Sequence, residues 1–240
     1  MNDKKAELIA QLLTKAESTT PEEAEALTEH AERLMIKYGI ELAQLQSRRS
    51  AHGQQAESIV AQRIDLRGAY ALDLRDGFAA VARALGLQPA HASISATEQA
   101  LFVYGFESDA RAAHTLLLSL QVQAVVAMRA WWRQHRDEYA WHTAWEREKA
   151  RGGFLRGFGM GAAERIRRNR EQAVAAAGSG TELVLASREQ RVADHVNTLG
   201  MRRARGRGVS DGAATGYGYR EGQRANTGER AVAARGRLTA

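Results

Sequence analysis

Apolar residues recur at helical spacing in two runs within the first 47 residues. The runs are Leu8, Ile9, Leu12, Leu13 and Ala16, then Ala24, Leu27, Ala31, Leu34, Met35 and Tyr38. Between them, Thr20, Pro21 and Glu23 form a helix-start signal, with threonine as N-cap, proline at the first helical position and glutamate placed for a capping box. Gly39 is expected to end the second helix, before a short helix over about 41–46. Residues 1–47 are therefore predicted to form a helical hairpin.

The period changes after the hairpin. Apolar and polar residues alternate from Ser58 to Leu66, as in a strand that buries one face. An amphipathic helix is predicted over 72–85, and two strands, over 91–95 and 100–106, are predicted to follow with a turn between them.

A long helix is expected to complete this unit. Ser108 is its predicted N-cap, and residues 110–128 are apolar nearly all round, so we expect this stretch to be buried at the centre of the protein. Further helices are predicted over about 153–176 and 182–197, with a basic loop over 200–208.

These patterns predict an α+β protein that is mostly α, in three parts. Residues 1–47 form the helical hairpin module. Residues 57–150 form a small β-α-β-β-α domain with the long central helix. Residues 151–240 form an arginine- and glycine-rich helical region whose tail is either weakly helical or flexible.

A glycine pattern recurs at an offset of 59 residues. Gly153, Gly157, Phe158, Gly159 and Arg165 are matched by Gly212, Gly216, Tyr217, Gly218 and Arg224. Small residues four positions apart let one helix backbone approach another closely. We interpret the two segments as packing partners, with chance similarity in a glycine- and arginine-rich sequence as the alternative.

Charge is distributed unevenly along the 240 residues, whose formal net charge is +6. Residues 1–47 carry 5 basic and 9 acidic side chains, whereas 147–171 carry 8 and 3, and 201–240 carry 9 and 3. The positive field is therefore expected in the C-terminal half, where it can meet phosphate or an acidic partner.

Two dense arginine clusters lie in this basic half. They are Arg165, Arg167, Arg168 and Arg170, then Arg202, Arg203, Arg205 and Arg207. Guanidinium groups suit phosphate through forked hydrogen bonds, and such contacts give salt-dependent binding with little sequence preference. We expect these arginines to contact nucleic acid, either DNA or RNA. An acidic protein partner and a solvated basic face without a ligand are the alternatives.

All four tryptophans lie between residues 131 and 145. On a continuous helix, Trp131, Trp141 and Trp145 share one side with His135, Glu138 and His142. Two histidines and a glutamate suit a metal or acid–base chemistry, but an aromatic packing face with a polar rim explains the same pattern. The sequence has no Walker loop, nucleophile elbow or metalloprotease motif. We expect no bound metal and no cofactor, and an enzyme is not favoured.

The chain has no cysteine, which fits a reducing compartment. Its first residues are charged and lack the apolar core of a signal peptide, and its longest uncharged stretch, 112–128, contains polar residues. We therefore expect a cytoplasmic protein that does not cross a membrane.

The N-terminal residues resemble the family catalogued as domain of unknown function 2786. The residues that carry the resemblance are Lys4, Lys5, Leu8, Leu12, Leu13, 16–18, 21–24, Ala31, Leu34, Met35 and 37–40. Residues 103–109 and 117–124 resemble the uncharacterised domain that often follows it. The resemblance covers about residues 4–135 and implies a phage, plasmid or bacterial setting, without an established activity or catalytic residue.

Three functions remain open at this point. The leading hypothesis is a nonenzymatic, nucleic-acid-associated accessory protein of a phage or mobile element, which aromatic side chains beside arginines would favour. The second is a protein-binding adaptor or inhibitor that acts on host machinery, favoured by an exposed apolar patch. The third is an uncharacterised enzyme, favoured by a pocket with converging polar groups.

Overall fold

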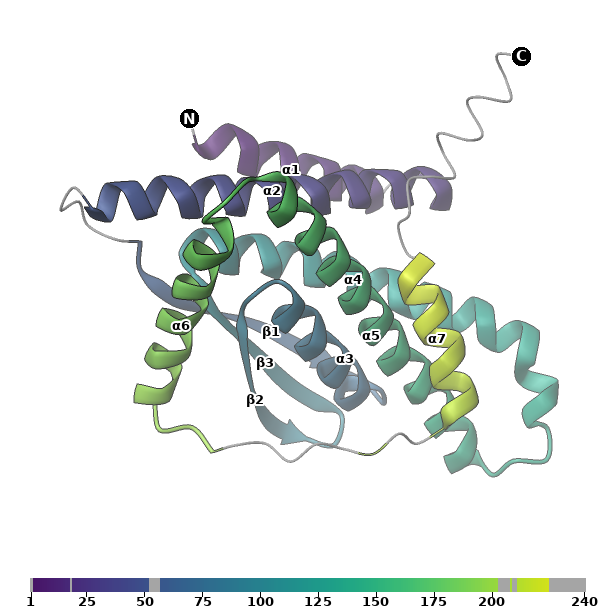
Figure 1. Ribbon diagram of the computed structural model, residues 1–240. Coiled ribbons are helices and arrows are strands. Elements are labelled where there is room, and N and C mark those ends of the chain that lie inside the picture. The colour runs from purple at the N-terminus through teal and green to yellow at the C-terminus, as the bar shows by residue number, and fades with distance from the viewer. Residues whose placement is uncertain (1, 18, 52–56, 203–207, 209–210, 225–240) are drawn as a thin grey trace, which may run out of the picture.

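The computed structural model describes residues 2–17, 19–51, 57–202, 208 and 211–224 (Figure 1). The elements follow in the order α1 (Asn2–Glu17), α2 (Pro21–Ala51), β1 (Ile59–Arg67), α3 (Ala71–Ala84), β2 (Gln88–Ser95), β3 (Glu98–Phe106), α4 (Glu107–His135), α5 (Ala144–Ala176), α6 (Thr181–Thr198) and α7 (Gly212–Arg224). A 3-10 turn, Arg136–Tyr139, lies between α4 and α5. This is the mostly helical α+β architecture that the sequence predicts.

The second helix begins where expected, although the Glu23 carboxylate accepts from the Thr19 hydroxyl instead of completing the predicted capping box. Helix α2 starts at Pro21, and the Glu23 backbone N–H donates to the Thr20 hydroxyl at 3.4 Å. The predicted stop at Gly39, with a separate short helix after it, is wrong, because α2 runs through to Ala51. Buried Ile40 and Ala43 beyond the glycine continue the packed face, and such tertiary contacts outweigh the roughly 1 kcal/mol that a glycine costs inside a helix.

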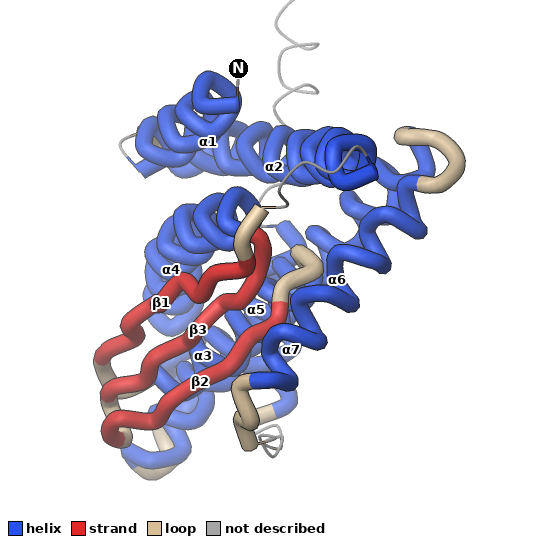
Figure 2. Tube along the Cα trace, turned by 90° about the vertical axis from the view of Figure 1, so that its left-hand side faces the viewer, coloured by secondary structure: helices blue, strands red, loops and turns tan. Residues whose placement is uncertain are grey.

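The three strands form one antiparallel sheet in the order β1-β3-β2. All three predicted strands are confirmed, with β2 beginning a few residues earlier than expected. Helices α3 and α4 pack against one face of the sheet. Figure 2 shows these helices behind the sheet and the strands turned towards the viewer. Pro89 lies in β2, an edge strand, where a missing N–H donor is tolerated.

The long helix α4 differs from its prediction in two respects. The Ser108 side chain does not cap it; instead the Ser108 backbone N–H donates to the Glu57 carboxylate at 2.6 Å. The helix is also not buried on all sides, because Leu118, Val122 and Val126 form an exposed stripe along it. These positions are four residues apart and share one face, while the opposite face contacts the sheet and α1.

Helix α5 begins with a capping box at Thr143 and Glu146, in which each side chain bonds to the backbone N–H of the other residue. It then packs against α3 on one side and α7 on another. The core thus draws on α1, α2, α3, α4, α5, α7 and the sheet, so the packing continues across the three parts that the sequence suggests.

The two glycine segments pack together as predicted, but not through every glycine of the repeated pattern: Gly212 and Gly216 meet no neighbouring backbone, and Gly159 meets Gly77 of α3. A Cβ added at Gly157 or Gly161 would overlap the backbone of Thr215 or Tyr219 in α7, and one added at Gly218 or Gly222 would overlap the backbone of α5. The contacts advance together along both helices, so α5 and α7 run parallel with their backbones nearly touching. No helix in the described ranges has a stretch long and apolar enough to cross a membrane.

Candidate nucleic-acid interface

The first predicted arginine cluster surrounds α5 rather than lining one face. Arg165 is buried at 6% exposure, where it forms an ion pair of 2.5 Å with Glu32 of α2 and donates to the Gly222 carbonyl oxygen at 3.1 Å. Burial raises the pKa of Glu32, and the Arg165 charge opposes that rise. Arg165 is therefore engaged inside the protein, away from any phosphate.

The other three arginines of this cluster all have carboxylate partners. Exposed Arg167 and Arg168 both bond to Glu164, the latter from Nε at 3.0 Å. Half-buried Arg170 pairs with Glu189 of α6 at 2.5 Å. Arg167 and Arg168 are thus the two members of the cluster that a phosphate could reach from the solvent. Glu164 already compensates part of their charge.

The second predicted cluster follows α6. Arg202 is exposed. Arg203, Arg205 and Arg207 lie outside the described residues, so their role in binding stays a prediction.

A groove at the end of the molecule distant from α1 and α2 gathers a different set of arginines. It lies between the turn after β1, the C-terminal half of α4 and the first part of α5, and has a volume of about 680 Å³. Gly68 forms the turn at φ +105°, a conformation that favours glycine. The lining side chains include Arg67, Arg129, Arg133 and Arg151, together with Tyr70 and Trp132, and no acidic residue.

Aromatic rings hold one of these arginines in place. The Arg151 guanidinium lies 4.9 Å from the Trp132 ring centroid and 5.7 Å from that of Tyr70. Its Nε donates to the Arg147 carbonyl oxygen at 3.1 Å, and this bond does not use the two terminal guanidinium nitrogens. Burial raises the pKa of the Tyr70 hydroxyl, and the Arg151 charge opposes that rise.

Most of the groove arginines lack a direct carboxylate partner. Arg67 pairs with Glu98 at 3.2 Å, whereas Arg129, Arg133 and Arg151 form no salt bridge with a carboxylate of the described residues. Arginines that converge beside aromatic rings are a typical surface for phosphate and bases.

Sequence reasoning missed this groove because its arginines come from three elements that are far apart in the chain. One local signal was present. Arg129, Trp132 and Arg133 lie within about one helical turn, which places an aromatic ring beside two cations on the surface of α4.

The expected tryptophan and histidine face does not exist as one surface. Helix α4 ends at His135, so Glu138 belongs to the 3-10 turn and His142 to the loop before α5, and the assumption of a continuous helix is wrong. The His135 ring stacks on Trp131 at 5.4 Å and lies within 2.9 Å of that residue's carbonyl oxygen. Within the described ranges, no three His, Cys, Asp or Glu side chains are close enough to hold a metal.

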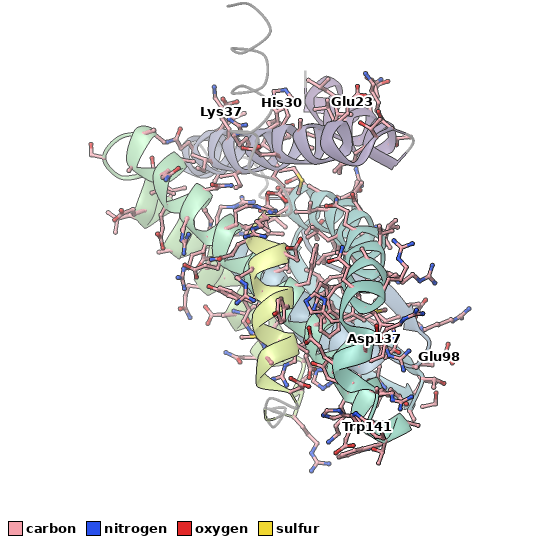
Figure 3. The ribbon with its side chains drawn as sticks, turned by 90° about the vertical axis from the view of Figure 1, so that its right-hand side faces the viewer. Glu23, His30, Lys37, Glu98, Asp137 and Trp141 are labelled. Atoms are coloured by element: carbon pink, nitrogen blue, oxygen red, sulfur yellow. The ribbon has the colours of Figure 1, made fainter. Side chains whose placement is uncertain are left out.

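Two of the tryptophans are instead exposed. Trp141 is 98% exposed and Trp145 is 62% exposed, with the Lys149 ammonium 3.7 Å from the Trp145 ring centroid. Figure 3 shows Trp141 at the tip of the molecule, at the same end as Glu98 and opposite Glu23, His30 and Lys37.

A small cavity of about 70 Å³ lies between α2, β3 and α6, but its charged groups neutralise one another. Arg188 bonds to Asp109 at 2.7 Å, and Arg170 bonds to Glu189. Burial raises the pKa of Asp109, and the Arg188 charge opposes it. The arrangement holds α6 against the start of α4 and leaves little room for a ligand.

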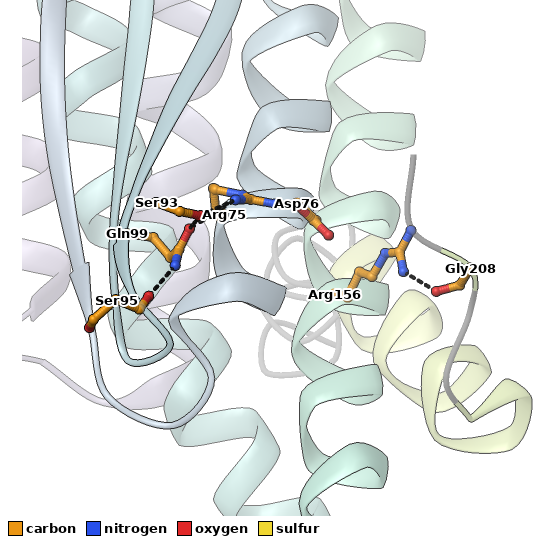
Figure 4. Close-up of polar contacts among 7 residues, drawn as sticks. All are labelled: Arg75, Asp76, Ser93, Ser95, Gln99, Arg156 and Gly208. Carbon is orange, nitrogen blue, oxygen red and sulfur yellow. Dashed lines mark hydrogen bonds and ion pairs between the residues drawn. The ribbon is translucent and has the colours of Figure 1, made fainter. Parts of the chain in front are cut away.

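A second polar network braces the β2–β3 hairpin against α3 (Figure 4). Buried Arg75 donates to the Gln99 side-chain oxygen at 2.8 Å and pairs with Asp76 at 2.8 Å. Gln99 in turn donates to the Ser95 carbonyl oxygen at 2.6 Å and accepts from the Ser93 hydroxyl at 2.7 Å. These groups satisfy one another, so we assign them a structural role.

Comparison with known proteins identifies the helix pair. No curated protein and no solved structure matches the chain. Residues 7–42, which span most of α1 and the first two thirds of α2, match the family model described as protein of unknown function (DUF2786). The resemblance of residues 103–109 and 117–124 to the domain that often follows this family lies outside the match and stays a prediction. The chain therefore carries a DUF2786 domain in its N-terminal helix pair.

Proposed function

We propose that this protein is a nonenzymatic accessory protein that binds nucleic acid through the groove lined by Arg67, Arg129, Arg133 and Arg151. The observation that carries the proposal is the combination of converging arginines, two aromatic rings and no acidic lining residue in one open depression. Polyanion binding needs uncompensated positive charge, and aromatic rings add contacts to bases. A setting in a phage or other mobile element rests on the family resemblance.

The groove proposal differs testably from the hypothesis drawn from the sequence. We expect Arg129→Gln/Arg133→Gln to weaken binding of a single-stranded oligonucleotide and to flatten the log–log salt dependence by about 0.7 per lost phosphate contact, or roughly 1.4 in all. The matched control is Arg167→Gln/Arg168→Gln, which removes the same charge from exposed positions that share Glu164. Anisotropy titrations at several salt concentrations measure both.

Each result of this comparison is informative. A loss confined to the α4 pair supports the groove. Equal losses indicate attraction by general charge and contradict a defined groove, and a larger loss for the α5 pair favours the arginine cluster that the sequence suggests. If the unaltered protein binds no oligonucleotide at low salt, the nucleic-acid proposal fails. Both variants should fold, because exposed substitutions change stability by about 0.5 kcal/mol or less.

A protein-binding adaptor is the second candidate, and the exposed tip favours it. Tryptophan is enriched at interface centres, and Trp141 is almost fully exposed. If this function is correct, an identified partner should stay bound after nuclease treatment. Trp141→Ser/Trp145→Ser should then release that partner, whereas Arg129→Gln/Arg133→Gln should retain it. The opposite pattern in quantitative binding assays would assign the interaction to the groove.

A further inference from the structure

The sheet has a second face, opposite α3 and α4, that displays aromatic rings. Phe102 and Tyr104 of the central strand β3 alternate with buried Leu101 and Val103, so their side chains point away from the helices. Both rings are half-buried: Phe102 lies between Arg63 of β1 and Ala90 of β2, and Tyr104 lies between Ala61 and Gln88. Figure 2 shows this face of the strands turned towards the viewer.

Arginines border this aromatic face at both ends. The Arg63 guanidinium lies 5.9 Å from the Phe102 ring centroid. At the other end α6 covers Phe106, where the exposed Arg191 lies 5.0 Å from the ring centroid. The acidic side chains of the face are already bonded, Asp65 to Arg63 at 2.8 Å and Glu98 to Arg67. The face is therefore apolar in its centre and neutral to positive at its rim.

The face is also rigid and continuous with the groove. Gln99, at the start of β3, is held by Arg75 of α3 (Figure 4), which fixes the hairpin that carries both rings. Arg67 belongs to the edge strand β1 and also lines the groove. It lies four residues along the strand from Arg63, or about 13 Å. A nucleic-acid strand whose phosphates lie in the groove can thus pass Arg67 and reach Phe102.

We propose that this face stacks the unpaired bases of a single-stranded nucleic acid whose backbone is held in the groove. The inference rests on the proposed function and adds the class of nucleic acid. Rings two residues apart on a strand are about 7 Å apart, so each can meet a separate base. Bases inside a duplex have their faces covered by their neighbours and cannot stack on side chains without being displaced, whereas unpaired bases stack on aromatic rings irrespective of sequence.

The test separates stacking from phosphate binding with two oligonucleotides of equal length and charge, one intact and one abasic in its central positions. The unaltered full-length protein should bind the intact strand more tightly, by about 5- to 150-fold per stacked base. Phe102→Leu/Tyr104→Leu should abolish this preference and leave binding of the abasic strand unchanged. Tyr219→Leu, a change at a half-buried tyrosine of α7, is the matched control and should keep the preference.

The outcomes distinguish the two proposals. If the unaltered protein binds both strands equally, or the leucine pair keeps the preference, the stacking inference is overturned and groove binding stands. If it binds neither strand, both proposals fail. Should the leucine pair not fold, photocrosslinking of the unaltered protein to a strand of halogenated uracils decides the question. Crosslinks at residues 98–106 support the inference, and crosslinks confined to other segments overturn it.

Discussion

Gly218→Ala is expected to detach α7 from α5 and to lower the free energy of unfolding. An added Cβ would overlap the carbonyl group of Phe154, which belongs to the backbone of a long helix and cannot rotate away. Overpacking of a core costs about 1–3 kcal/mol, and a contact with backbone should reach the top of that range or exceed it. Chemical denaturation measures the loss, and limited trypsin digestion at Arg220 reports whether α7 has detached.

A matched control lies two residues earlier on the same helix. A Cβ at Gly216 meets nothing closer than the end of the Arg220 side chain, 3.8 Å away. Gly216→Ala should therefore leave the contact intact and stabilise α7 by up to about 1 kcal/mol through helix propensity. If both alanine variants have the same stability and digestion pattern, the close approach of the two helices does not hold them together.

This contact was predictable because it depends on residue spacing. Glycines four positions apart lie on one helix face, so the spacing of Gly157 and Gly161 alone indicates a close backbone contact. The strands were predictable for a similar reason, since alternation such as that of Arg63 to Leu66 in β1 is a local pattern that follows from the geometry of a half-buried strand. Local periodicity thus predicts elements and the faces that they bury.

The same spacing also explains why Arg165 differs from its neighbours in the sequence. It continues the four-residue series of Gly157 and Gly161, and so lies on the face of α5 that meets α7, whereas Arg167 and Arg168 are turned by about 200° and 300° from it. A cluster of arginines in the sequence is therefore not one surface on a helix. Considering the helical angle of each residue would have separated the buried arginine from the exposed pair.

The groove could not be derived in this way. Its arginines are brought together by the packing of β1, α4 and α5, which depends on contacts between segments distant in the chain. The break between α4 and α5 is an intermediate case. Thr143 and Glu146 have the spacing of a capping box, so a helix start was visible in the sequence, although the tryptophans on either side suggested one continuous helix.

Arg165→Met is expected to destabilise the protein by about 3–5 kcal/mol, because it leaves Glu32 buried without its ion-pair partner. Glu32 is 1% exposed and lies in the DUF2786 helix pair, so its ion pair with Arg165 joins that domain to α5. Arg165 also donates to the Gly222 carbonyl oxygen, which extends the connection to α7. A loss of this size is a large part of the roughly 5–15 kcal/mol typical of a folded domain. Arg168→Met is the control, since its exposed pairing with Glu164 should contribute about 1 kcal/mol or less.

The pH dependence of this variant identifies the cause of the loss. Burial raises the pKa of Glu32 above 4.5, and removal of the opposing Arg165 charge should raise it further. The folded state then holds a proton that the unfolded state has lost, so the free energy of unfolding falls as pH rises from 4.5 through the folded-state pKa. The free energy of unfolding of Arg165→Met should therefore fall short of that of the unaltered protein by less near pH 5 than at pH 8.

The double variant Glu32→Gln/Arg165→Met lacks the buried carboxylate, so it should lose less stability at pH 8 and show no such recovery at low pH. A deficit that is the same at both pH values, or one that the double variant fails to relieve, would mean that lost packing rather than an unpaired charge destabilises the protein.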